Sequence, residues 1–148
     1  MEINTRDFGL VQVDEDDLYE FNEGIYGFED CKKFAVFKKS FDDISFLYLQ
    51  SVEQLDPCFL VFNPWDLYPG YKPILSNDDM NACDADTIED LIFLVIASIP
   101  SSIEEMSFNI KSPVVLNPRN KKAKQVILLN KDYSVRYQPF LKDGKAGH

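Results

Sequence analysis

Residues 34–64 read FAVFKKSFDDISFLYLQSVEQLDPCFLVFNP. Three short runs rich in aromatic and β-branched residues are separated by Asp, Ser, Gln and Pro residues that favour turns. They cover residues 34–37, 46–51 and 58–63. Pro57 and Pro64 bracket the third run, where proline is tolerated because a strand end does not need its missing amide hydrogen. This stretch predicts three consecutive antiparallel strands.

The same pattern continues on both sides of this stretch. Further strands are expected at residues 8–13, 18–21, 91–99, 107–111, 114–117, 124–129 and 133–137, with a hairpin turn at 117–122. A helical turn is expected at 28–33, and a short helix is expected after Ser76, a typical N-cap residue. We therefore expect a mainly β, compact antiparallel barrel-like or two-sheet domain with one or two short helices, because closure removes exposed strand edges.

Composition favours one soluble folded domain. The chain has 148 residues, of which 45% are hydrophobic and 14% aromatic, enough for one packed core. We expect that domain to span residues 1–142, with residues 143–148 as a tail or an added terminal remnant. The net charge is −10, and residues 1–90 hold 21 acidic and 6 basic side chains. Such a surface repels polyanions, so direct contact with nucleic acid is not expected.

The cysteines and the N-terminus indicate a reducing compartment. The three cysteines, Cys31, Cys58 and Cys83, are an odd number without a CxxC pair, which fits neither a disulfide framework nor a zinc site. The N-terminus lacks the features of a signal peptide, and the apolar run at 91–99 is about half of the roughly 20 residues that span a bilayer. We expect a cytoplasmic protein that does not contact the membrane.

The sequence does not support any of the common catalytic motifs. The sole histidine is His148, so a Ser–His or Cys–His arrangement has no base in the body of the domain. The acidic residues fall mostly in turns, and the carboxylates of Asp79, Asp84 and Asp86 lack the spacing of a calcium-binding loop. Phosphate-binding glycine motifs are missing from the sequence. We expect no enzyme activity, no cofactor and no metal.

Two binding functions stay open on the residues alone. The basic cluster of Arg119, Lys121, Lys122 and Lys124 is compatible with a small β-barrel that binds RNA, although the net charge opposes it. A barrel that carries a small ligand in its interior is the other alternative, but 20 aromatic side chains leave little free volume. The aromatic loop at residues 65–73 either caps one barrel end or forms part of a partner groove.

Seven segments, taken together and in order, resemble one protein family. They are Thr5–Gly9, Gly24–Glu29, Leu49–Val52, Phe59–Pro64, Asn109–Asn117, Lys124–Leu128 and Tyr133–Arg136. The chain resembles the bacterial flagellar assembly factors of the FliW family. Two departures are visible: Asn22 replaces a proline that is common in the turn before Gly24, and Trp65 follows Asn63-Pro64 where phenylalanine is more usual.

The resemblance implies a function without catalysis. A protein of this family is expected to be a compact barrel-like regulator that binds flagellin near its terminal helical regions and also binds the translational repressor CsrA, one partner at a time. When flagellin is exported, the free regulator would capture CsrA and relieve the repression of flagellin translation. A monomer is expected.

Partner-binding residues are assigned here by motif position alone. For flagellin, whose terminal segments call for an apolar groove with a polar rim, we expect Phe62, Asn63, Pro64 and Tyr71. For CsrA, we expect Gln50 and the segment Asn109–Asn117, including Asn109, Pro113 and Asn117. A bound acidic protein would also add a repulsive field beside the RNA-binding surface of CsrA.

Overall fold

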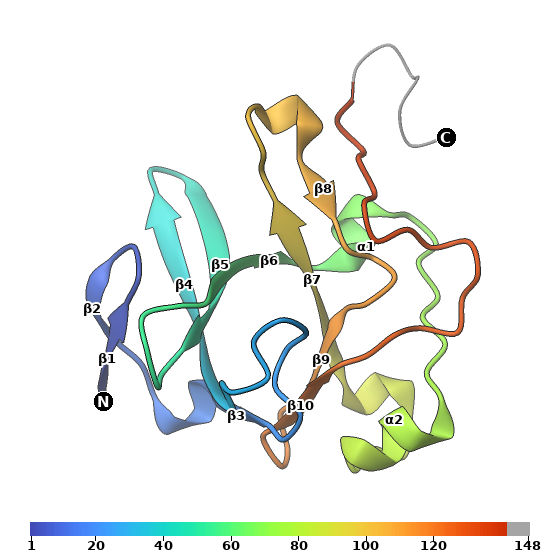
Figure 1. Ribbon diagram of the computed structural model, residues 1–148, viewed down its shortest axis with the longest axis horizontal. Coiled ribbons are helices and arrows are strands. Elements are labelled where there is room, and N and C mark those ends of the chain that lie inside the picture. Colours follow the sequence, from blue (N-terminus) through green and yellow to red (C-terminus); the bar gives the residue numbers. More distant parts are fainter. Residues whose placement is uncertain (142–148) are drawn as a thin grey trace.

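The computed structural model describes residues 1–141, and seven of its ten strands close into a barrel from which hairpins project (Figure 1). The strands are β1 Glu2–Thr5, β2 Gly9–Gln12, β3 Leu18–Phe21, β4 Lys33–Phe41, β5 Ile44–Ser51, β6 Cys58–Phe62, β7 Ile92–Ser98, β8 Ser107–Phe108, β9 Val114–Asn117 and β10 Lys122–Gln125. Two short helices, α1 Pro64–Leu67 and α2 Asn77–Ala82, and three 3-10 turns, Glu15–Asp17, Ile88–Asp90 and Ile103–Glu105, complete the described chain.

Seven strands close into a barrel in the order β6-β5-β4-β3-β10-β9-β7, because β6 also pairs with β7. All neighbours in this ring are antiparallel except β3 and β10, which pair in parallel. Strand β8 pairs with the end of β7, and β1–β2 form a separate hairpin. The mainly β, barrel-like fold class predicted from the sequence is confirmed.

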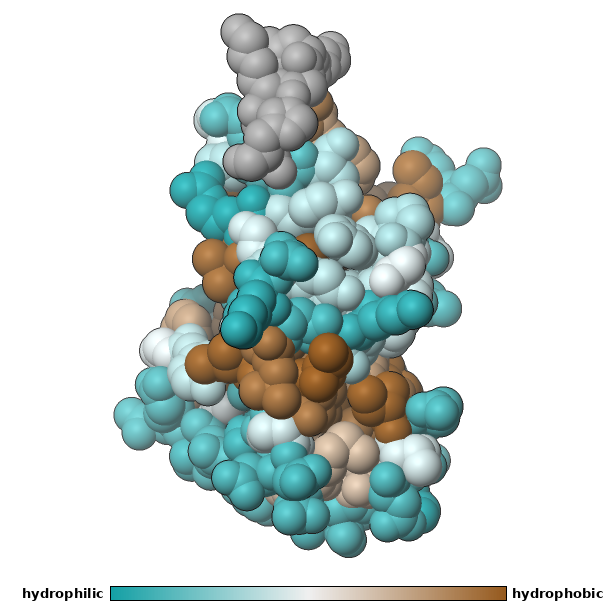
Figure 2. Space-filling view, turned by 90° about the vertical axis from the view of Figure 1, so that its right-hand side faces the viewer, coloured by the Kyte–Doolittle hydropathy of each residue, from teal (hydrophilic) through white to brown (hydrophobic). Residues whose placement is uncertain are grey.

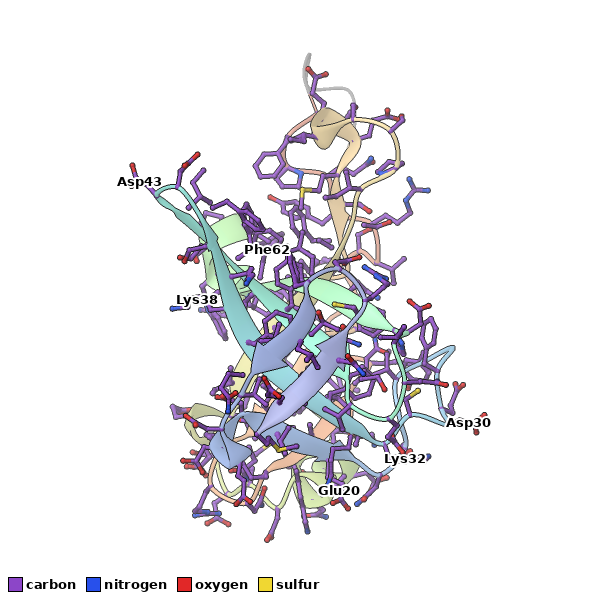
Figure 3. The ribbon with its side chains drawn as sticks, turned by 90° about the vertical axis from the view of Figure 1, so that its left-hand side faces the viewer. Glu20, Asp30, Lys32, Lys38, Asp43 and Phe62 are labelled. Atoms are coloured by element: carbon purple, nitrogen blue, oxygen red, sulfur yellow. The ribbon has the colours of Figure 1, made fainter. Side chains whose placement is uncertain are left out.

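The β4–β5 hairpin is longer than the barrel wall requires. Its eight residue pairs run from Phe34–Ser51 to Phe41–Ile44, and β6 pairs only with the part of β5 from Leu47 to Gln50. The free end projects from the barrel with Asp43 at its tip (Figure 3). Asp42 adopts a φ of 56° in this turn, a backbone conformation that aspartate tolerates in tight turns.

The hydrophobic core has three parts. The barrel interior holds the first, which includes Phe21, Phe34 and Leu49. The second lies between the other face of β7–β9 and the segments around α1, α2 and the C-terminal residues, with Tyr71 and Phe108 at its centre. The third is covered by the β1–β2 hairpin. Each part takes inward-facing residues from strands that alternate between buried and exposed positions.

Several local expectations were wrong. Residues 28–33 form no helical turn, since the segment 22–31 is a chain of tight turns with one β-bridge between Ile25 and Phe28. Residues 133–137 form no strand, and only Tyr137 bridges to Phe108. Tyr133 packs against the second core instead, where its ring stacks on the Tyr71 ring with centroids 4.9 Å apart. Strand β10 ends at Gln125, before the expected 129.

The short helix expected after Ser76 was confirmed. Ser76 caps α2, since its side chain accepts a hydrogen bond from the amide of Asp79. Cys31, Cys58 and Cys83 are free and buried. Within residues 1–141, no helix has the length and apolar character needed to cross a bilayer. The expected tail at 143–148 lies outside the described residues.

Candidate partner-binding grooves

The barrel closes at a short seam between β6 and β7. Only two residue pairs form this seam, Val61 with Ile96 and Phe62 with Val95. On one side of the seam, Phe59 and Ser98 line a larger groove; on the other side, Phe62 and Leu94 line a smaller one. The two grooves share no lining residue. The structure therefore offers two separate recesses where the sequence analysis expected partner-binding residues.

The larger groove combines polar and apolar lining residues, and several of the apolar ones are exposed. Its volume of about 610 Å³ is bounded by the 25–26 turn, β6, β7, the β8–β9 connection, β10 and the segment 127–136. Tyr26, Ile127 and Val135 line it and are 56%, 54% and 56% exposed. Large apolar side chains that gather in one recess and stay this exposed are typical of an interaction site.

Hydrogen bonds fix the polar floor of the larger groove. The Gln125 side chain accepts a bond from the Tyr26 amide at 3.0 Å and donates one to the Ser112 carbonyl at 3.1 Å. Asn109 Oδ1 accepts from the Ser112 amide at 2.9 Å, and the Asn109 amino group has no partner within residues 1–141. Gln125 thus ties the turn that carries Tyr26 to the floor that carries Asn109.

An ion-pair cluster centred on Lys124 anchors β10 next to the groove residue Gln125. Lys124 Nζ lies 2.9 Å from Asp79 Oδ1 and 3.1 Å from Glu23 Oε2, which joins β10, α2 and the 22–31 segment. The hydrogen bond to Asp79 raises the pKa of Lys124 above its ordinary value. Asp79 is buried, so the expectation that it is a solvated turn residue was wrong. The helix α2 brings it under β10, which sequence spacing does not reveal.

The smaller groove contains two of the expected flagellin-binding residues. Phe62 and Asn63 line this recess of about 340 Å³ together with Phe46, Ile92 and Asp66. The Phe62 ring packs edge-on against Phe108 at 5.2 Å. Asn63 is exposed, and its Oδ1 caps α1 by accepting a bond from the Trp65 amide. Asn63 therefore has a local structural role and an accessible position.

The remaining expected site residues are buried. Gln50 is fully buried; its side chain accepts from the Arg6 amide and donates to the carbonyls of Ser51 and Leu55. Tyr71 donates from its hydroxyl to the Ile110 carbonyl, and burial raises its pKa. Asn117 donates to the Cys83 carbonyl. Pro64 and Pro113 are also buried. Direct contact between these side chains and a partner would require the domain to open.

The aromatic loop packs largely against the second core. Tyr71 belongs to the core, whereas Trp65 packs edge-on against Tyr71 at 5.3 Å and stays 43% exposed. The indole of Trp65 donates to the Tyr71 carbonyl. The loop therefore covers one end of the second core and leaves one face of Trp65 on the surface.

The basic turn is largely engaged within the domain. Lys121 donates to the Asp16 carbonyl and lies over the Tyr19 ring, and Arg119 donates to the Asp84 carbonyl. Lys124 belongs to the ion-pair cluster. Of the four cations, only Lys122 has neither kind of contact within residues 1–141. Cations that are held by internal partners make a poor platform for phosphate groups.

Burial lowers the reactivity of two cysteine thiols in the described part of the chain. Burial raises the pKa of the Cys58 thiol to about 11 and also raises that of Cys83, so neither is a ready nucleophile. Residues 1–141 contain no group of three or more His, Cys, Asp or Glu side chains placed to hold a metal ion.

The sequence alone assigned no partner-binding role to most of the residues that line the larger groove, among them Tyr26, Ile127, Val135 and Arg136. A signal existed for Ile127, because residues 126–129 alternate between buried and exposed positions and the two outward residues, Ile127 and Leu129, are both apolar. Leu129 donates a backbone bond to Ile74, another exposed apolar residue. A band of hydrophobic surface crosses the side of the molecule that includes α2 and its flanking segments (Figure 2).

Comparisons with known proteins agree with this fold. A family model described as FliW protein matches residues 2–139. The flagellar assembly factor FliW of Thermoanaerobacter pseudethanolicus is 36% identical over 148 residues, which is 100% of this chain and 98% of that protein. The FliW of Caldanaerobacter subterraneus subsp. tengcongensis is 34% identical over the same shares of both chains. A crystal structure of the flagellar assembly factor FliW superimposes with a TM-score of 0.84 at 26% identity and covers 97% of this chain and 99% of that one. The chain therefore belongs to the FliW family of flagellar assembly factors.

Proposed function

We propose that this protein is a non-enzymatic regulator of flagellar assembly that binds flagellin and antagonises the translational repressor CsrA by partner switching in the cytoplasm. The observation that carries the proposal is the match to flagellar assembly factors over nearly the whole chain. The two grooves that flank the β6–β7 seam supply recesses for protein partners.

The charge distribution supports CsrA as one partner. Glu15, Asp16, Glu20 and Asp30 are exposed, and Glu20 and Asp30 direct their side chains outward beside Lys32 (Figure 3). CsrA must present basic surface to RNA phosphates, so a bound protein of net charge −10 places a repulsive field beside that surface and opposes RNA there.

The direct test is a titration with purified CsrA followed by competition with purified flagellin. The proposal expects a complex with each partner at micromolar concentration, and release of CsrA when flagellin is added. Failure to bind both partners, or a stable complex that holds both at once, would contradict partner switching.

Salt should separate two effects of this protein on CsrA. We expect inhibition of RNA binding by CsrA to fade as salt rises, while the affinity of this protein for CsrA fades less, because the repulsion between an acidic surface and RNA is screened over about 10 Å at 0.1 M salt. Filter binding of labelled RNA and calorimetry at several salt concentrations provide the two curves. Equal salt dependence of the inhibition and of the affinity for CsrA would contradict the electrostatic contribution.

The variant Asn63→Ala tests the smaller groove. It removes the exposed amide in that groove together with the α1 cap, which costs about 1 kcal/mol of stability. We expect a loss of affinity for flagellin of about tenfold, or 1.4 kcal/mol. The variant Ser76→Ala loses a comparable cap on α2 at a residue that lines neither groove, and it serves as the control. Unchanged affinity for both flagellin and CsrA would remove Asn63 from the site.

A further inference from the structure

The larger groove presents apolar surface that nothing in residues 1–141 covers. Tyr26 is about 100 residues away in sequence from Ile127 and Val135, yet the three residues line one recess and are each more than half exposed. Beneath them the Gln125 side chain is engaged, because it accepts a hydrogen bond from the Tyr26 amide and donates one to the Ser112 carbonyl, whereas the Asn109 amino group has no partner within residues 1–141. An occupant can therefore place apolar side chains against these three residues and a hydrogen-bond acceptor at the Asn109 amino group.

The charge of the groove selects between the two proposed partners. Arg136 is the single charged residue that lines it, and this side chain is exposed without an ion pair within residues 1–141. Among the described residues no carboxylate lines this groove, and two of the carboxylates on the 22–31 segment are engaged elsewhere, since Glu23 pairs with Lys124 and Glu29 accepts from the Gly27 amide. An unpaired guanidinium beside apolar walls favours a carboxylate and disfavours a basic partner surface.

We propose that the larger groove docks a terminal amphipathic segment of flagellin, whose apolar face covers Tyr26, Ile127 and Val135 and whose carboxylate pairs with Arg136. This inference rests on the proposed function. It assigns Asn109 to the flagellin surface instead of the CsrA surface, because Asn109 lies in the floor of this groove with a free amino group. CsrA is then expected on acidic surface beside the groove, on the 22–31 segment that carries both Tyr26 and the exposed Asp30, so that the two partners overlap there and exclude one another.

The test measures flagellin and CsrA affinities in parallel for the full chain and for three variants. Val135→Asp places a charge on the apolar wall, Ile127→Ser removes apolar surface, and Arg136→Glu reverses the charge. We expect each to weaken flagellin binding about tenfold or more and to change CsrA binding less than about twofold. Arg136→Glu should also flatten the salt dependence of flagellin binding, which a purely structural role would not do.

Matched controls lie elsewhere on the surface. Leu10→Asp changes an apolar residue that is 63% exposed on β2, and Lys131→Glu reverses an exposed cation that does not line the groove. Thermal melts confirm that each variant is folded. If the unmodified chain binds neither partner, the proposed function fails. If the unmodified chain binds flagellin and the groove variants bind it equally well, or if they lose CsrA to the same extent, the groove assignment is overturned.

Discussion

Replacement of Gly24 by alanine is expected to lower the free energy of unfolding by about 3–5 kcal/mol. Gly24 has a φ of +69°, which costs a residue with a side chain about 1–3 kcal/mol. A Cβ added there would also lie 2.6 Å from the Cα of Glu29 and 2.7 Å from its carbonyl oxygen. Both atoms belong to the backbone, so the 22–31 segment would have to open to make room.

Gly27→Ala is the matched control for this prediction. Gly27 also has a positive φ, +89°, but a Cβ there would meet no atom within 4 Å. We expect a loss of only about 1–2 kcal/mol, from backbone strain alone. Urea unfolding followed by tryptophan fluorescence gives both values. Equal losses for the two variants would show that the close approach to Glu29 carries no energetic weight.

The position of Gly24 also connects this prediction to the larger groove. The 22–31 segment carries Tyr26, and Phe28 of the same segment packs against Phe59 with ring centroids 5.6 Å apart. A displaced segment would therefore move one apolar wall and disturb a second. We expect Gly24→Ala to weaken flagellin binding in proportion to the population in which this segment is open.

The second large effect is expected from Lys124→Met. The substitution removes the cation that pairs with both Asp79 and Glu23, and it leaves the carboxylate of Asp79 buried without a charged partner. Breaking a buried pair from one side costs about 3–5 kcal/mol. Lys122→Met, two residues earlier on β10 and exposed, should cost less than about 0.5 kcal/mol. Similar losses for the two variants would contradict a stabilising role for the cluster.

The pH dependence gives an independent check on Lys124. Its pKa is higher in the folded chain than the ordinary value of 10.5, so the ion pairs stabilise the fold fully below that value. This stabilisation is lost as the pH rises through the folded-state pKa. Buried Tyr71 and Cys58 act in the same direction, because burial raises their pKa values as well. The difference in stability between the unmodified chain and Lys124→Met, followed from pH 9 upward, isolates Lys124, and a difference that stays constant would refute the assignment.

The strand content could be read from the sequence because it depends on local pattern. Apolar runs bounded by Pro57 and Pro64 predicted β6, and the turn at 117–122 predicted the β9–β10 hairpin. The aromatic residues at 133–137 predicted a strand that does not form. Tyr133 is aromatic because its ring stacks on Tyr71 in the core, not because it belongs to a strand. Local pattern cannot distinguish a residue that pairs along a ladder from one that packs against a distant ring.

Residue type alone did not identify the partner-binding residues, because the sequence does not show which side chains the fold leaves exposed. Gln50 and Asn117 were expected to bind partners, yet the fold buries both amides and satisfies them internally. Asn63 and Asn109, expected on the same grounds, lie in grooves. An asparagine or glutamine in a motif serves equally well as a structural bridge or as a contact residue, and only its exposure separates the two roles.

The sequence by itself determined the class of fold, the acidic balance and the resemblance to flagellar assembly factors, since these follow from composition and from patterns within a few residues of each other. Only the tertiary structure decided that β6 and β7 meet over two residue pairs, and that Tyr26, Ile127, Val135 and Arg136 share one groove. These residues are as much as 110 positions apart in the chain, from Tyr26 to Arg136. Barrel closure brings them together, and closure depends on the packing of every strand at once.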